Sequence, residues 1–282
     1  MRFIWGSKIP FSFICVNSNL NLALKLFYRK SGSGKPIVIL HGLLGMSDNW
    51  VSFANRFPEG YEVFLPDLRN HGQSPHDSRF DYTCMAEDLH GFLLDLSLQE
   101  VTLIGHSMGG KLAMVFAFTY PDLIKKLIVI DMAPRYYPPH HGHIFAALEN
   151  LDLSKITSRA EAAQNLAIQE ESTKLFLLKN LFRNTENNQV FAWRFNLQGI
   201  RENLPEIGKE IKRSDDANPK SLSFQTLFVK GENSEYIKSE DLALMGLLFP
   251  GFQMAEIKNA GHWVHADEPE MLFQEIIAFL EA

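Results

Sequence analysis

Short apolar runs alternate with helical patterns through the first half of the chain. These runs occupy residues 35–40, 61–66, 101–105 and 126–131, and Val and Ile are prominent in them. Continuous apolar runs of this length are typical of strands that are buried on both faces of a parallel sheet. Because the strands alternate with helical segments, the sequence predicts a layered α/β fold.

The pattern changes after Asp131. A loop rich in Pro and His comes first, at residues 134–143, and residues 144–212 then alternate polar and apolar positions at helical spacing with almost no strand signal. Strand patterns return at residues 223–231 and 252–261. This order predicts that a helical insertion divides the α/β core.

The chain closes with a predicted helix over residues 269–280. We therefore expect a core in two pieces, a helical cap between them, and an N-terminal segment without an assigned role. The expected boundaries are 21–134 and 216–282 for the core, 135–215 for the cap, and 1–20 for the N-terminal segment.

Composition excludes several classes of protein. Of 282 residues, 46% are hydrophobic and 21% are charged, which is typical of a soluble globular protein. The formal charge is -6 and no Lys/Arg-rich cluster occurs, so nucleic acid is not an expected partner. Cys15 and Cys84 are too far apart for a short metal or redox motif and too few for a disulfide framework. This cysteine usage favours a cytoplasmic location.

Hydrophobic stretches give no sign of membrane insertion or export. Each stretch is broken by Lys, Asp, Pro or Gly well before it reaches the 18 or so apolar residues that a bilayer span needs. The apolar segment at residues 9–16 contains Pro10 and Ser12, and no small-residue cleavage site follows it. We therefore expect neither integral membrane association nor a secretory signal.

The sharpest chemical motif is a glycine-flanked serine. Gly105-His106-Ser107-Met108-Gly109 lies between the strand ending at Gly105 and a helix expected to begin near Lys111. A tight strand-to-helix turn of this kind projects the serine hydroxyl above the sheet. Serine is a weak nucleophile unless a base takes its proton, so Ser107 needs a histidine partner.

Ten histidines compete for that role. His262 follows the last predicted strand, where loops at the carboxyl ends of a parallel sheet build sites, and the base comes last in the expected chain order. His265 is the main rival. His41, His71 and His106 sit beside glycines and are expected to bond the backbone.

The acid is a choice between two strands. In many proteins with this strand pattern it follows the strand after the insertion, but that turn offers Ser234, with Glu232 and Glu235 as the nearby carboxylates. Asp131 ends an apolar strand, where a charge needs a partner, and it can orient His262 there. We favour Asp131, with Glu232, Glu235 and a purely structural Asp131 left open.

Two backbone N–H groups are expected to bind the oxyanion that forms during acyl transfer. Met108, directly after the nucleophile, supplies one. Leu43, in the glycine-rich loop after the first strong strand, supplies the other, since Gly42 lets the backbone turn back toward Ser107.

Other polar residues are interpreted as structural. His140, His141 and His143 have no Cys or carboxylate at metal-ligand spacing, which favours a solvated loop over a metal site. We expect an ion pair between Asp67 and Arg69 to tie the loop that also contains Ser74. Asp88 is expected to pack against or cap a helix.

Several motifs together resemble the α/β-hydrolase superfamily, specifically the YbfF-type bacterial esterases and their eukaryotic abhydrolase-domain relatives. The resemblance runs from about residue 22 to 280, and its motifs are HGLLGMSDNW, DLRNHGQSPH, GHSMGGK, IDMAP, WRFNL and GENSEY. It implies an α/β-hydrolase fold, with a mostly parallel sheet and a helical cap over the pocket. It also implies a triad of Ser107, Asp131 and His262. Those relatives place the acid after the strand that follows the turn with the nucleophilic serine.

The expected function is serine-dependent hydrolysis of carboxylic esters with short to medium acyl groups, with acyl-CoA thioesters open to the same chemistry. We expect a small-molecule substrate, no cofactor, no metal, and a monomer or homodimer. A C–C bond hydrolase with the same triad is the alternative within enzymes. A ligand-binding member of the fold that has lost turnover is the alternative from a different class.

Overall fold

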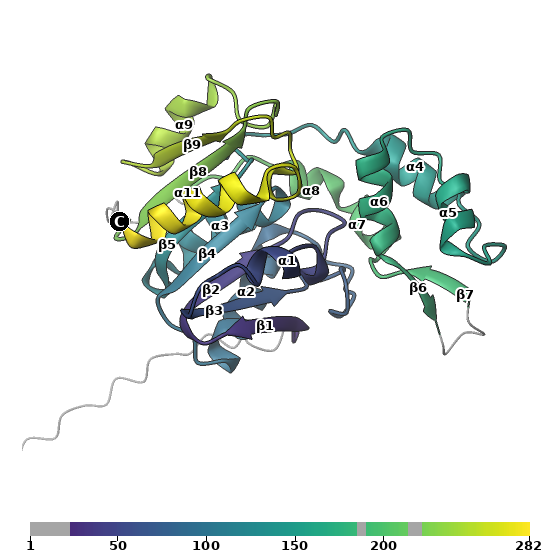
Figure 1. Cartoon of the computed structure of the whole chain (residues 1–282), viewed down its shortest axis with the longest axis horizontal. Coiled ribbons are helices and arrows are strands. Elements are labelled where there is room, and N and C mark those ends of the chain that lie inside the picture. Colours follow the sequence, from purple (N-terminus) through teal and green to yellow (C-terminus); the bar gives the residue numbers. More distant parts are fainter. Residues whose placement is uncertain (1–22, 185–189, 214–221) are drawn as a thin grey trace, which may run out of the picture.

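Figure 1 shows the computed structural model of the chain, which describes residues 23–184, 190–213 and 222–282. The N-terminal segment expected at residues 1–20, its apolar stretch at 9–16 and Cys15 lie outside the described residues.

A mostly parallel sheet forms the centre of the described structure. Its seven strands have the order β1-β3-β2-β4-β5-β8-β9, and only β1 runs antiparallel to its neighbour. The strands are β1 (Tyr28–Gly32), β2 (Gly34–Leu40), β3 (Gly60–Pro66), β4 (Val101–His106), β5 (Ile124–Ile130), β8 (Gln225–Gly231) and β9 (Gln253–Ile257). This confirms the predicted α/β class and all six predicted strands.

Alternate residues of the central strands pack on opposite faces of the sheet. On β4, Leu103 joins the apolar cluster under α2, α3 and α9, while Ile104 joins the cluster under α1 and α11. Residues two apart share a face because the side-chain period of a strand is two. The helices outside the segment between β5 and β8 are α1 (Val51–Ala54), α2 (Tyr82–Asp95), α3 (Met108–Thr119), α9 (Asp241–Leu248), α10 (Val264–Asp267) and α11 (Pro269–Glu281). Burial on both faces explains why the strand sequences are continuously apolar.

A separate group of elements lies between β5 and β8. Figure 1 shows them together beside one end of the sheet. They are α4 (Gly142–Asn150), α5 (Arg159–Asn165), α6 (Glu171–Lys179), β6 (Leu181–Asn184), β7 (Val190–Trp193), α7 (Leu197–Glu202) and α8 (Leu204–Gly208). The helical character was predicted, but the near absence of strands was wrong, because β6 and β7 pair as an antiparallel ribbon. The division into core and cap at the expected boundaries stays a prediction.

Two further differences concern single elements. The edge strand β1 was not predicted, since its YRKSG sequence is polar and largely exposed. Helix α3 begins at Met108 rather than near Lys111, so the turn that holds Ser107 is as short as a turn can be. Within the described ranges, no helix is both long enough and apolar enough to cross a membrane.

Candidate active site

Ser107 is a one-residue turn between a strand and a helix. Strand β4 ends at His106 and α3 begins at Met108, so Ser107 alone reverses the chain, with φ 54° and ψ -120°. Its N–H donates to the carbonyl of Ile130 at 3.1 Å, and its carbonyl accepts from Lys111 N at 3.1 Å. A non-glycine residue held at positive φ stores strain that the surrounding structure must support, and such strain clusters at functional sites.

The flanking glycines allow this turn because the chain crosses itself closely there. A Cβ on Gly105 would lie 2.2 Å from the Gly109 carbonyl oxygen, and one on Gly109 would lie 2.5 Å from the Leu40 carbonyl oxygen. Both distances are far inside van der Waals contact with rigid backbone. Glycine at both positions is therefore required by packing, as the motif predicted.

Gly105→Ala should destabilise the fold. Its methyl group would meet backbone that cannot move aside, so we expect the free energy of unfolding to fall by about 1–3 kcal/mol or more. Gly246→Ala in α9 is the matched control, since the nearest atom to its Cβ lies 3.9 Å away. That change should raise the free energy of unfolding by up to about 1 kcal/mol. Urea denaturation of both variants measures the difference, and equal stabilities would contradict the packing argument.

Three predicted side chains form a chain of hydrogen bonds. His262 lies in the loop between β9 and α10, and its Nε2 is 3.0 Å from Ser107 Oγ. Its Nδ1 is 2.7 Å from Asp131 Oδ2. Because the carboxylate can only accept, Nδ1 donates to it, which leaves Nε2 free to accept the serine proton.

Asp131 is completely buried directly after β5. Besides His262, its carboxylate accepts the N–H of Gly231 at 3.1 Å and the hydroxyl of Ser234. These donors compensate the cost of burying a charge. Ser234, which stands where an acid was expected, thus donates to Asp131, which follows the neighbouring strand.

The alternatives for acid and base point elsewhere. Glu232 accepts from Lys258 and from the N–H of Asn259, and the latter bond lowers the pKa of Glu232. The side chain of Glu235 is 87% exposed. His265 stacks on Trp50 with ring centres 4.1 Å apart, and burial lowers its pKa to about 3.

The imidazole of His262 is also held by an aromatic ring. Tyr236 stacks on it with centres 3.7 Å apart and planes 14° apart. This contact, together with the hydrogen bonds at both ring nitrogens, fixes the orientation of the His262 ring. Tyr236 is the last residue of the GENSEY motif, but its stacking on His262 was not predicted, because the two residues are 26 positions apart in the chain.

The predicted oxyanion residues lie beside Ser107. Leu43, Met108 and Ser107 line one cavity together. Met108 is the first residue of α3, and N–H groups of a first helical turn have no acceptor within their helix. Leu43 belongs to the turn closed by the bond from Gly45 N to the Gly42 carbonyl, at 3.0 Å.

Two buried histidines form hydrogen bonds to the turn that contains Leu43. His41 Nε2 accepts the N–H of Leu68 at 2.9 Å, so its Nδ1 donates to the Gly42 carbonyl at 2.8 Å. His71 Nε2 likewise accepts the N–H of Leu44 at 3.0 Å. Burial lowers the pKa of both rings, which favours the neutral tautomers that these bonds require. The predicted backbone bonding of His41 and His71 is confirmed, and His106 likewise bonds the His262 carbonyl.

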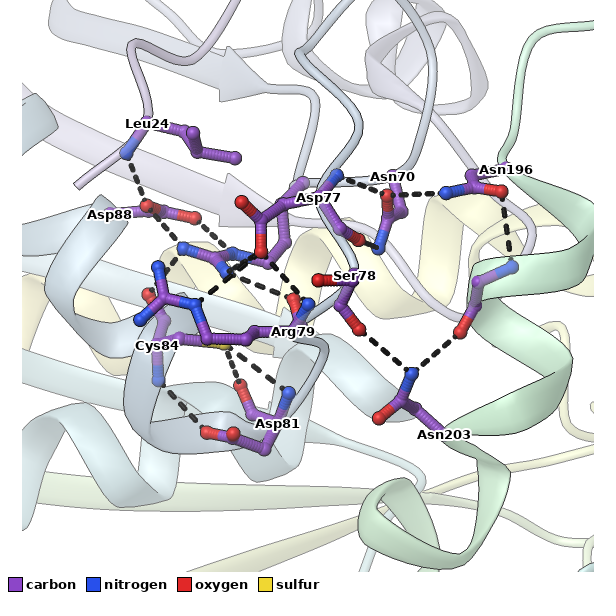
Figure 2. A network of polar contacts seen from close by, with 12 residues as sticks. Leu24, Asn70, Asp77, Ser78, Arg79, Asp81, Cys84, Asp88, Asn196 and Asn203 are labelled. Carbon is purple, nitrogen blue, oxygen red and sulfur yellow. Dashed lines mark hydrogen bonds and ion pairs between the residues drawn. The ribbon is translucent and has the colours of Figure 1, made fainter. Parts of the chain in front are cut away.

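The predicted ion pair between Asp67 and Arg69 is wrong. Arg69 pairs with Asp88 through two hydrogen bonds of 2.6 and 2.8 Å, and both side chains are buried. Asp67 instead accepts backbone N–H groups of Ser47 and Gln73 at 2.6 and 2.8 Å. Backbone donors that need a partner occupy its carboxylate, so the nearby guanidinium turns to the helix. Figure 2 shows the network around Asp88.

The same network joins the loop after β3 to α7. Asn196, the N-cap of α7, donates its backbone N–H to the Asn70 carbonyl at 2.9 Å and its side-chain N–H to Asn70 Oδ1 at 3.1 Å. Asn203 at the end of α7 donates to the Ser78 carbonyl at 3.1 Å (Figure 2). The WRFNL motif therefore marks a contact between the insertion and the core.

Two cavities meet at Ser107. The smaller has a volume of about 40 Å³ and is lined by Met108, Lys111 and Tyr137 among others. The larger has a volume of about 580 Å³ and is lined by His262 and Trp263, and by α6 residues of the insertion.

His140 and His141 line both cavities, so the expectation of a merely solvated loop was incomplete. Burial lowers the pKa of His141 to about 4. His140 Nε2 lies 2.8 Å from the hydroxyl of Tyr236, the ring that stacks on His262. The loop thus forms part of the wall of the site.

The model of the α/β hydrolase fold family matches residues 35–269. The chain belongs to the α/β hydrolases. It is 37% identical to the sn-1-specific diacylglycerol lipase ABHD11 of Danio rerio, over 94% of this chain and 84% of that protein. It is 35% identical to esterase YbfF of Escherichia coli, over 88% of this chain and 94% of that protein. Among solved structures, a marine microorganism esterase superposes with a TM-score of 0.86 and 41% identity, covering 91% of this chain and all of that one.

Proposed function

We propose that this α/β hydrolase cleaves carboxylic esters through an acyl-enzyme on Ser107. The observation that carries the proposal is the hydrogen-bonded chain from Asp131 through His262 to Ser107, which opens into two cavities. Relatives named esterase and lipase support ester hydrolysis as the reaction. A cytoplasmic location and a monomeric or homodimeric state stay predictions.

Each group has one task in the proposed mechanism. Ser107 Oγ attacks the acyl carbon while its proton passes to His262 Nε2, and Asp131 stabilises the resulting imidazolium. The carbonyl oxygen becomes an oxyanion, which the N–H groups of Leu43 and Met108 bind. Collapse expels the alcohol, which takes the proton from His262. Water then repeats the sequence on the acyl-enzyme and releases the acid.

The need to protonate the leaving group indicates which cavity holds the alcohol and which holds the acyl group. The departing oxygen must receive its proton from His262, and only the larger cavity is lined by His262. The alcohol therefore occupies the larger cavity and the acyl group the smaller one. A volume of about 40 Å³ favours short acyl groups, and the room on the alcohol side admits a bulky alcohol or a thiol such as that of a thioester.

Covalent labelling tests the proposed nucleophile. The protein should hydrolyse p-nitrophenyl acetate and butyrate, and one equivalent of a fluorophosphonate should abolish that turnover. Mass spectrometry should find the phosphonyl group on the peptide that contains Ser107. Turnover that survives complete labelling, or a label on another serine, would contradict the proposal. Failure to hydrolyse any ester, in a folded protein, would favour the C–C hydrolase or the binding protein.

A further inference from the structure

A lysine is buried one helical turn beyond the nucleophile. Lys111 follows Ser107 by four residues on α3, which corresponds to about 6 Å along the helix axis. Its side chain is 1% exposed, and it lines the smaller cavity. Lysine is almost never fully buried unless it is paired, so this position needs an explanation.

The ammonium group lies at the wall of the cavity without a carboxylate partner. Lys111 Nζ donates to the carbonyls of Gly208 and Lys209, the former at 3.1 Å, and lies 4.8 Å from the centre of the Tyr137 ring. Gly208 and Tyr137 line the same cavity. In the described part of the chain, no Asp or Glu forms an ion pair with Lys111. An ammonium has three donors, so one is left for a ligand.

The charges around Lys111 do not compensate its own. Burial, together with a smaller contribution from the nearby Arg135, lowers the pKa of Lys111 to about 7, although Glu210 raises it from a distance that does not make an ion pair. Arg135 itself pairs with Asp241. A buried cation without a counter-ion costs free energy, and an anion bound in the cavity would remove that cost.

We propose that Lys111 binds a carboxylate at the far end of the acyl group, so that monoesters of short dicarboxylic acids are preferred substrates. The inference rests on the proposed ester hydrolysis and on the acyl group occupying the smaller cavity. Ser107 and Lys111 line the same small cavity, so a short acyl group bound there can reach both residues. The ester carbonyl then lies at Ser107 while the free carboxylate meets the ammonium.

A purely structural role would have a different consequence. The two carbonyls that Lys111 meets end α8, and a lysine at a helix C-terminus stabilises such carbonyls. If Lys111 only tied α8 to α3, its loss would impair all esters alike. A binding role affects the charged acyl group selectively.

The experiment compares two substrates of nearly the same size and shape, one ending in a carboxylate and the other in a neutral amide. For the wild type, kcat/KM should be at least about tenfold higher for ethyl hydrogen succinate than for ethyl succinamate, in line with a hydrogen bond to a charged group. In Lys111→Met this ratio should approach one. Using the ratio cancels any general loss of turnover in the variant.

Lys126→Met is the matched control. Lys126 also donates to two backbone carbonyls, those of Phe279 and Leu280, and lies 5.0 Å from the Phe279 ring, but it is on β5 at the opposite end of the strand from Asp131. Its ratio should match the wild type. A wild-type ratio near one would overturn the proposal, as would a high ratio that survives in Lys111→Met.

The wild type offers a second test if the variant does not fold. The ratio should fall as the pH rises through 7, since the free enzyme then loses the proton of Lys111. The other titratable groups near Lys111 are Arg135 and Glu210, together with Tyr82, Tyr137, His140 and His141 in the same cavity wall. Burial raises the pKa of both tyrosines and lowers that of His141 to about 4, so these three groups stay neutral around pH 7. Any effect of pH on acyl transfer itself is common to both substrates and cancels in the ratio. A ratio that stays constant up to pH 9 would contradict the role of Lys111.

The outcomes also separate this inference from the proposed function. If p-nitrophenyl butyrate is hydrolysed in a Ser107-dependent way but the succinate pair shows no preference, only the role of Lys111 fails. If neither the ethyl esters nor p-nitrophenyl butyrate are hydrolysed, the ester hydrolase itself is refuted.

Discussion

Ser107→Ala should lower kcat for p-nitrophenyl butyrate by at least about 10³-fold. Without Oγ no acyl-enzyme forms, and what remains is the binding of the ester and of its oxyanion. The 3.0 Å contact between Ser107 Oγ and His262 Nε2 makes this serine the one that the base can deprotonate. The initial rate of p-nitrophenolate release at saturating substrate measures the loss of kcat. Thermal melting of both proteins shows whether the variant is folded.

Ser97→Ala is a demanding control for this change. Ser97 has the same φ as Ser107, 54°, but is exposed in the turn after α2. Both substitutions therefore place alanine at a positive φ, which is unfavourable for any residue with a Cβ. Ser97→Ala should keep wild-type kcat. Substantial turnover by Ser107→Ala in a folded protein would remove Ser107 from the mechanism.

The core strands and the turn at Ser107 were predictable because the constraints on them act on residues that are close together in the sequence. Strands buried on both faces must be largely apolar, and β4 is buried in every residue while β5 is buried and apolar over residues 127–130. The turn at Ser107 needs glycines at Gly105 and Gly109 because backbone passes there within 2.5 Å of where a Cβ would lie. Such constraints leave a mark in the sequence itself.

Features decided by distant contacts were missed or misjudged. The edge strand β1 is polar and largely exposed, and it pairs with β3 on one side only. The short strands β6 and β7 are stabilised by each other, which a helical pattern conceals. Arg69 forms its ion pair with Asp88, 19 residues away. The carboxylate of the nearby Asp67 instead accepts hydrogen bonds from backbone N–H groups.

The site itself shows the same division. Ser107 and His262 follow from motif and chain order, whereas the stacking of Tyr236 on His262 and the burial of Lys111 depend on how the insertion and the β8 loop fold back over the sheet. The proposed acid, Asp131, could be predicted only in part. Asp131 directly follows β5 and Ser234 lies three residues after the neighbouring strand β8, and only their contact in space shows that the serine donates to the aspartate.

Asp131→Asn should reduce kcat by about 10⁴-fold and change KM little. The carboxylate accepts from three donors, the N–H of Gly231, the hydroxyl of Ser234 and Nδ1 of His262. An amide has one oxygen to accept with, and its nitrogen donates, so His262 is driven to the tautomer with its proton on Nε2. That tautomer cannot accept the proton of Ser107. One unsatisfied buried donor also costs about 1–3 kcal/mol of stability, which chemical denaturation measures separately.

Glu232→Gln decides between the two strands that can supply the acid. Glu232 bonds Lys258 and the N–H of Asn259 rather than His262, so its neutralisation should leave kcat near the wild-type value. Steady-state kinetics of the two variants with the same ester give opposite results for the two assignments. If Asp131→Asn kept near-normal kcat while Glu232→Gln lost orders of magnitude, the acid would belong to the loop after β8. The full burial of Asp131 against His262 would then be a structural contact, and the orientation of the base would need another source.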